Sequence, residues 1–255
     1  LRRDLSEINR EGGELVMIRL LAAERLKMKG TWIPILLFLG PIGLILAMMA
    51  DFGLRKEYLL QQNTDNWTVL IGEASMLLPL MILLGATLLA SLLAEMEHQA
   101  SAWQHTLALP LSRFKIYGSK GIQLIGLLII VAILLVLSFA FLWFWIDLGK
   151  PVPWDQFLKA GFYPVLAVLP VAMLQLWLSI IIRNQALPIF IGVVCSLFGG
   201  IHTKWLPWAY PINAIPIDSL EKNNPAFWVP VGIGLGLLLL ILGALDFSRR
   251  EVKGG

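Results

Sequence analysis

The sequence predicts an all-α, polytopic membrane protein with six transmembrane helices. Of its 255 residues, 58% are hydrophobic and 15% are charged, whereas soluble domains carry about 25% charged residues. Six stretches lack Asp, Glu, Lys and Arg, and a helix needs about 20 apolar residues to cross a bilayer. These stretches are Gly30–Ala50, Ala74–Ala94, Gly121–Ile146, Ala160–Ile182, Asn184–Thr203 and Asn223–Leu245.

The distribution of basic residues predicts that both termini are cytoplasmic. With the N-terminus inside, the inner segments hold 14 of the 20 Lys and Arg residues and the outer segments hold 6. Lys and Arg concentrate in cytoplasmic loops. The net charge of +3 then reflects topology. Because no basic stripe with interleaved aromatic residues lies outside the membrane flanks, we expect no nucleic-acid partner.

The N-terminal part divides at a methionine. Residues 1–16 form a polar extension of mixed charge, and residues 17–255 form a single six-span domain; Met17 and the Leu1 region are both candidate native starts. Between Leu15 and Lys29 the apolar residues share one helical face. This predicts an amphipathic helix on the inner membrane surface, in contact with lipid. The alternative is that it is only the start of the first span.

The first two spans are expected at Trp32–Ala50 and Val69–Ala94, joined by an outer loop, Asp51–Trp67. Glu73 lies about one turn inside the outer end of the second span, where its carboxylate can reach the interface. It is a candidate contact for a cationic substrate or a partner subunit. The alternative is a solvated interfacial carboxylate.

A polar segment, Glu95–Lys120, separates the second and third spans. Trp103, Leu107, Leu111 and Phe114 recur in it at helical spacing. This pattern suits short helices that lie on a membrane surface or against a protein. Pro110 cannot continue a helix, so two short helices with a break are expected.

The third span is predicted at Ile122–Ile146 and ends with Trp143 and Trp145, placed as in an aromatic belt. An outer loop, Asp147–Lys159, leads to the fourth span, Gly161–Ile182. The chain then turns at Arg183, Asn184 and Gln185 into the fifth span, which forms a tight hairpin with the fourth.

The last third of the domain begins with a broken apolar segment. Residues 202–224 are rich in Trp and Pro and are expected in the outer interface or as a re-entrant segment. The sixth span, Phe227–Leu245, contains Gly232 and Gly236, a pair of small residues that permits close helix contact. The tail from Asp246 is predicted to be cytoplasmic.

Motifs for catalysis or cofactor binding are missing. The sequence has no G-x-x-x-x-G-K-[ST], H-E-x-x-H or G-x-S-x-G motif. His98 and His105 would lie two helical turns apart, too far to share a metal ion, and the single Cys195 is expected to serve packing. The chain is therefore not expected to be an enzyme or to bind a cofactor. Without buried ionisable residues for ion coupling, its energy is expected to come from another chain.

The polar segment and the span pattern resemble the permease subunits of type-2 ABC exporters. The loop is similar to that of the lantibiotic-immunity and bacitracin-resistance permeases, and Met17-Ile-Arg-Leu-Leu-Ala-Ala-Glu-Arg-Leu-Lys is similar to their N-terminal helix. Ala102 stands where that family usually has Gly. The loop residues that carry the resemblance are Glu97, Trp103, Leu109-Pro110-Leu111-Ser112-Arg113 and Lys120.

The resemblance implies a coupling helix in the cytoplasmic loop that contacts a separate ABC-type ATP-binding subunit, which would bind ATP and Mg. Its implied coupling residues are Glu97, Trp103, Leu107, Pro110, Arg113 and Lys120. It also implies a second permease subunit, identical or homologous, in a bacterial cytoplasmic membrane.

By the same resemblance, the cargo would be an amphipathic peptide antibiotic such as a lantibiotic, exported for self-protection. Two alternatives stay open. One is another cargo, such as a drug, a lipid or a polysaccharide precursor. The other is a membrane anchor or sensor without transport.

Overall fold

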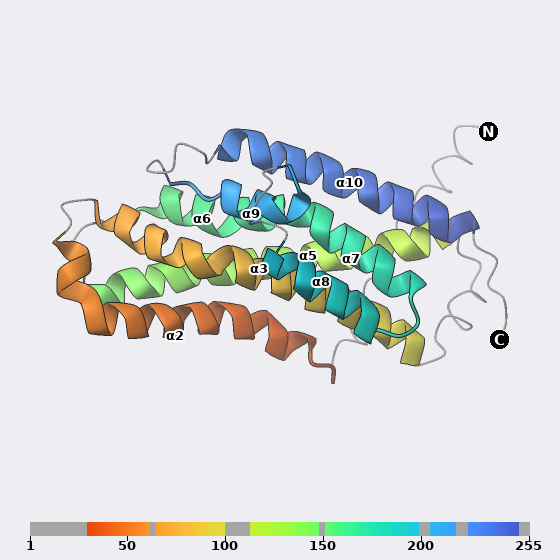
Figure 1. Ribbon diagram of the computed structural model, residues 1–255, viewed down its shortest axis with the longest axis horizontal. Coiled ribbons are helices and arrows are strands. Elements are labelled where there is room, and N and C mark those ends of the chain that lie inside the picture. The colour runs from red at the N-terminus through yellow and green to blue at the C-terminus, as the bar shows by residue number, and fades with distance from the viewer. Residues whose placement is uncertain are drawn as a thin grey trace, which may run out of the picture.

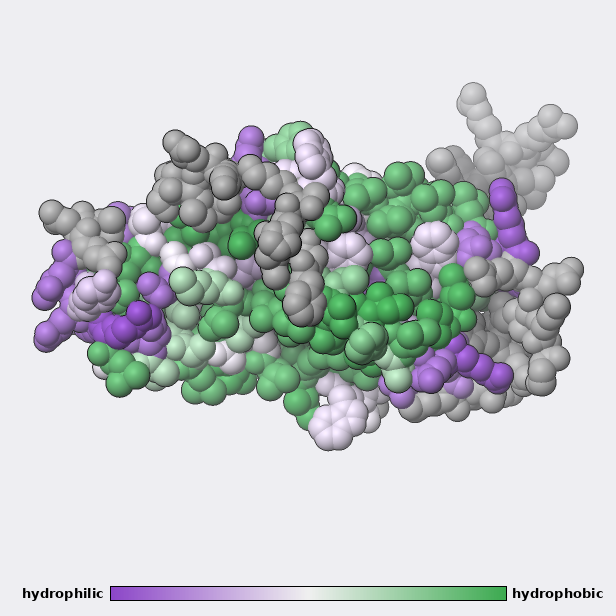
Figure 2. Space-filling model, viewed as in Figure 1, coloured by the Kyte–Doolittle hydropathy of each residue, from purple (hydrophilic) through white to green (hydrophobic). Residues whose placement is uncertain are grey.

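The computed structural model describes residues 30–61, 65–99, 113–147, 151–198, 205–217 and 224–249. Over these ranges the regular secondary structure is entirely helical. Figure 1 shows an elongated bundle whose long helices run along its long axis. Figure 2 shows a broad apolar middle and hydrophilic residues towards both ends, as a bilayer requires. The predicted all-α class is confirmed.

Five described stretches are long and apolar enough to cross a membrane. They are α2 (Ile33–Leu60), α3 (Asn66–Gln99), α5 (Arg113–Ile146), α6 with α7 (Trp154–Ala167 and Leu169–Ile181) and α10 (Pro225–Arg249). We call the end of the bundle where α3 ends and α5 begins the inner end. The opposite end, where α2 leads into α3, is the outer end (Figure 1).

The helices extend further than the uncharged stretches predicted. The outer loop predicted at Asp51–Trp67 is wrong in extent, because α2 continues to Leu60 and α3 starts at Asn66. The polar segment predicted from Glu95 to Lys120 is also shorter, since α3 runs to Gln99 and α5 starts at Arg113. Charged residues do not break a helix once it leaves the hydrocarbon region, so the absence of charge marks the membrane core and not the helix ends.

The fourth predicted span is two helices instead of one. Val168 separates α6 from α7 because Pro170 has no backbone N–H to continue the helical ladder. The Val168 N–H still donates to the Pro164 carbonyl at 3.1 Å, and Ala172 donates to the Val168 carbonyl at 3.0 Å. The break is thus short. The outer loop predicted as far as Lys159 ends earlier, because α6 begins at Trp154.

The fifth predicted span corresponds to α8 (Ala186–Phe198), a helix of 13 residues. At 1.5 Å per residue it is about 20 Å long, less than the about 30 Å of a bilayer core. Its continuation lies outside the described residues, so a sixth span is not confirmed. The turn predicted at Arg183–Gln185 is found between α7 and α8.

A short helical segment precedes α10. It consists of a 3₁₀ turn, η1 (Pro207–Ala209), and α9 (Tyr210–Asn213). Tyr210 and Ile215 are buried, and the Tyr210 ring lies 4.9 Å from that of Trp228 on α10, measured between centroids. The broken character predicted for residues 202–224 is confirmed for 205–217. Its depth in a bilayer stays a prediction.

Helix α10 packs on the junction of α6 and α7 through its glycines. A Cβ atom at Gly232 would lie 2.7 Å from Cα of Ala167, and one at Gly236 would lie 2.6 Å from Cβ of Leu169. Real Cβ atoms do not approach so closely, so only glycine permits this contact. The predicted role of this glycine pair in close helix packing is confirmed, within one chain.

Several predictions fall outside the described residues. They are the extension 1–16, the amphipathic helix Leu15–Lys29, and the end of the C-terminal tail beyond Arg249.

Candidate functional site

The predicted coupling segment is described only at its two ends. Trp103, Leu107 and Pro110 lie outside the described residues, and for Glu97 the structure gives only its backbone position near the end of α3. Arg113 is the first residue of α5. Residues 100–112 therefore link the end of α3 to the start of α5.

The last turn of α3 is fastened to the end of α7. His98 Nε2 donates to the carbonyl oxygen of Ser179 at 3.1 Å, and Gln185 Nε2 donates to the same oxygen at 2.8 Å and to the Ile182 carbonyl at 3.0 Å. The last carbonyls of a helix lack helical donors. Two side chains from outside α7 supply donors here, so α3, α7 and the α7–α8 turn are joined at one point.

A buried polar seam continues from this point into the bundle. Ser91 Oγ and Ser179 Oγ lie 3.1 Å apart, and Gln175 Nε2 donates to Ser91 Oγ at 3.2 Å and to the Pro188 carbonyl at 2.8 Å. All three side chains are at most 3% exposed. Buried polar groups without partners are costly, so this seam holds α3, α7 and α8 in one register.

Helix α8 contacts the seam through small residues. Pro188, Gly192 and Ser196 are buried and follow one another at intervals of four, on one helical face. A Cβ atom at Gly192 would lie 2.4 Å from Cγ2 of Thr87 and 2.8 Å from Oε1 of Gln175. The close approach of α8 to α3 thus depends on glycine at this position.

Sequence reasoning missed the seam residues Ser91, Gln175 and Ser179. A signal was present, because Thr87 and Ser91, and also Gln175 and Ser179, are uncharged polar pairs spaced by four within apolar runs. Only the tertiary structure brings the two pairs together.

Lys120 lies inside the inner end of the bundle. Its side chain is 2% exposed, although it was predicted in a basic flank of the coupling segment. On the same helix, the Tyr117 ring lies 6.0 Å from that of Phe247, and nearby Trp177 Nε1 donates to Asp246 Oδ2 at 3.0 Å. These contacts tie α5 and α7 to the end of α10. Any coupling role of Lys120 would therefore act through the position of α5.

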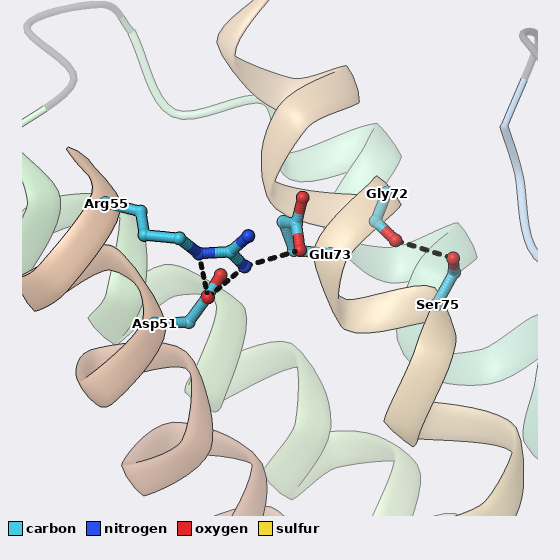
Figure 3. A network of polar contacts seen from close by, with 5 residues as sticks. All are labelled: Asp51, Arg55, Gly72, Glu73 and Ser75. Atoms are coloured by element: carbon cyan, nitrogen blue, oxygen red, sulfur yellow. Dashed lines mark hydrogen bonds and ion pairs between the residues drawn. The ribbon is translucent and has the colours of Figure 1, made fainter. Parts of the chain in front are cut away.

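Glu73 lies towards the outer end, far along α3 from His98, and has a partner within the chain. Arg55 Nε donates to Asp51 Oδ1 at 2.8 Å, and Arg55 Nη2 lies 3.5 Å from Glu73 Oε2 (Figure 3). The guanidinium of Arg55 therefore bridges α2 and α3. A contact between Glu73 and a substrate or a second subunit stays a prediction.

The comparisons identify the family. Residues 20–199 match the family model described as ABC-2 family transporter protein. No curated protein matches the chain. The matched family consists of membrane components of ABC transporters, which implies an ABC ATP-binding partner in general. With its apolar helices, the chain is a multi-pass membrane protein. It belongs to the ABC-2 family of transporter proteins.

Proposed function

We propose that the chain is the permease subunit of an ATP-driven exporter and that the segment Glu97–Arg113 couples it to the ATP-binding subunit. One observation carries the proposal. The helix that enters this segment is fastened to α7 and the α7–α8 turn by His98 and Gln185, and the helix that leaves it packs on α10. A displacement of the segment is thereby transmitted to α3, α5, α7 and α8 together.

The mechanism uses the motion of the ATP-binding subunits. When ATP draws two of these subunits together, they push on the segment of each permease, and the inner ends of the helices tilt. In the predicted contact, Trp103 is the apolar anchor, Pro110 makes the bend, and Arg113 provides positive charge at the start of α5. Two permease subunits, identical or homologous, enclose the pathway.

The proposed cargo is an amphipathic peptide antibiotic such as a lantibiotic, taken from the membrane and released outside a bacterial cell. The resemblance of the loop around Trp103 and Leu109–Arg113 to lantibiotic-immunity permeases supports this choice. The family match by itself is compatible with other cargoes.

Substitution of Trp103 tests the coupling role. In the complex reconstituted with its ATP-binding subunit, Trp103→Ala is expected to separate ATP hydrolysis from transport, because the apolar anchor is lost. The matched control is Trp145→Ala, at the outer end of α5, where the side chain is 43% exposed. Transport that is unchanged in the Trp103 variant would contradict the proposal.

Cell protection tests the cargo. Cells that express the chain with its ATP-binding partner are expected to survive a lantibiotic concentration that kills cells carrying the Trp103→Ala variant. Equal killing, together with ATPase activity that responds to a drug or a lipid precursor, would favour another cargo. ATPase activity that responds to no cargo would favour the anchor or sensor role.

A further inference from the structure

An ion network lies between α2 and α3 at the outer end of the bundle. Arg55 on α2 donates to Asp51 and reaches across to Glu73 on α3 (Figure 3). Helix α2 begins at Ile33, and Asp51 lies about 27 Å along the helix from there. This length is close to the thickness of a bilayer core, about 30 Å. The charged side chains of the network therefore lie at the depth of lipid headgroups, in the leaflet at the outer end.

The network has hydrogen-bonding capacity to spare. Arg55 uses Nε and Nη2 for Asp51 and Glu73, so within the described residues its Nη1 group has no acceptor. Glu73 contributes only Oε2 to the bridge, and its side chain is 24% exposed, against 49% for Arg55. Because two carboxylates share one guanidinium, the network is net negative. A ligand that suits it brings a cationic donor to Glu73 and an anionic acceptor to Arg55.

An apolar groove lies deeper along the same two helices. Its volume is about 260 Å³, and every lining residue is hydrophobic or glycine. Helices α2 and α3 form most of the lining, and α5 contributes Leu128 and Val131. Two of the lining residues are Gly40 and Gly85, where a Cβ atom would meet nothing within 4 Å. Glycine at these two positions thus leaves space in the groove that a larger side chain would fill.

The ion network and the apolar groove follow one another along the α2–α3 interface. Leu84 of the groove lies about three turns beyond Glu73 on the same face of α3, and Leu37 lies about five turns from Arg55 on the same face of α2. On α3, the groove begins at Met81, about 12 Å along the helix from Glu73. One leaflet contributes about 15 Å of hydrocarbon. An acyl chain that starts beside Glu73 can therefore reach the groove.

We propose that phosphatidylethanolamine binds along the α2–α3 interface, in the leaflet at the outer end. Its phosphate accepts from Nη1 of Arg55, its ammonium donates to Glu73, and the end of one acyl chain enters the groove beside Gly85. This lipid carries both required charges in one headgroup. Phosphatidylcholine has no N–H on its ammonium, and phosphatidylglycerol has no cation, so neither can donate a charged hydrogen bond to Glu73. Bound in this way, the lipid holds α2 against α3.

Competition between lipids tests the headgroup. The purified full chain in detergent is mixed with equal amounts of phosphatidylethanolamine, phosphatidylcholine and phosphatidylglycerol that carry identical acyl chains, and bound lipid is counted by native mass spectrometry. Phosphatidylethanolamine is expected to bind about tenfold better than the other two. Glu73→Gln is expected to abolish this preference. Asp155→Asn, which removes the carboxylate of another exposed ion pair at the same end, should retain it. Equal binding of the three lipids to the unaltered chain, or a preference that survives in Glu73→Gln, would overturn the proposal.

A photoreactive acyl chain tests the groove. Phosphatidylethanolamine with a diazirine near the chain end is expected to label the peptides of α2 and α3 that line the groove. Gly85→Leu, which fills the groove, should reduce this labelling severalfold. Gly126→Leu on α5 is the matched control, because its Cβ position also lies in open space but the residue is not in the groove lining. Labelling spread evenly over the helices, or unchanged in Gly85→Leu, would contradict a chain in the groove. Neither experiment requires the ATP-binding subunit or a cargo, so the proposed function is tested separately.

Discussion

The Nε2 atom of His98, in the last turn of α3, lies 3.1 Å from the carbonyl oxygen of Ser179, in the last turn of α7. This hydrogen bond lies at the inner end of the bundle, where the last turn of α3 enters the predicted coupling segment. It joins α3 to the hairpin of α7 and α8.

Removing this bond is expected to weaken coupling more than folding. His98→Ala leaves the Ser179 carbonyl with the Gln185 donor, so the free energy of unfolding should fall by only about 1 kcal/mol. Transport per ATP hydrolysed should fall strongly. His98→Gln, which retains a side-chain N–H donor, is the matched control. Transport coupling that is normal in the alanine variant would show that the bond serves stability alone.

Breaking the buried polar seam between α3, α7 and α8 is expected to lower stability moderately. Gln175→Leu keeps the approximate size but removes the donor to Ser91 and Pro188, and hydrogen bonds between membrane helices contribute about 0.6 kcal/mol and up to about 1.7 kcal/mol. The thermal midpoint in detergent should fall. Gln61→Leu, at the exposed end of α2, should leave it unchanged. An equal effect of both substitutions would contradict a structural role of the seam.

The glycines of α10 provide a sharp packing test. Gly232→Ala places a Cβ atom 2.7 Å from Cα of Ala167, and overpacking of this kind costs about 1–3 kcal/mol. Gly234→Ala is the ideal control on the same helix, because nothing lies within 4 Å of its Cβ position. Thermal unfolding of both variants measures the difference. If Gly234→Ala is as destabilising as Gly232→Ala, helix contact is not the cause.

Breaking the ion pair between Arg55 and Glu73 at the outer end is expected to lower stability slightly. Arg55 is exposed, and its pairing with Glu73 should contribute little to stability, as for other surface ion pairs. Arg55→Ala and Glu73→Gln should each lower the thermal midpoint slightly, and the double variant should be no worse than Arg55→Ala alone, which already loses the pairs with both Asp51 and Glu73. The double-mutant cycle formed by these variants measures the interaction energy between Arg55 and Glu73.

Export measured in the same variants separates the two roles of Glu73. If Glu73→Gln abolishes lantibiotic protection while Arg55→Ala preserves it, Glu73 contacts the cargo. If both preserve protection, the bridge serves only to join α2 and α3.

The position of Trp143 shows where sequence reasoning ended. With Trp145 it was predicted in an interfacial belt, yet Trp143 is 4% exposed and its ring lies 5.7 Å from that of Phe157 on α6, while Trp145 is 43% exposed. Both residues occupy the same end of one helix. Which of the two tryptophans is buried depends on where α6 packs against α5. The spacing of apolar residues along α5 does not carry that information.

By itself, the sequence determined the helical membrane class, five of the uncharged runs that form helices long enough to cross a bilayer, and the turn at Arg183–Gln185. These features follow from the high cost of placing charges and unpaired backbone groups in hydrocarbon. That cost does not depend on which other helix packs against the span, so the sequence alone reveals it. The tertiary structure alone decided that Ser91 meets Gln175, that Gly232 meets Ala167, that Lys120 is buried, and that α6 and α7 are separate helices. Such contacts join positions far apart in the chain, and they depend on the rotation of each helix about its axis, which packing against its neighbours selects.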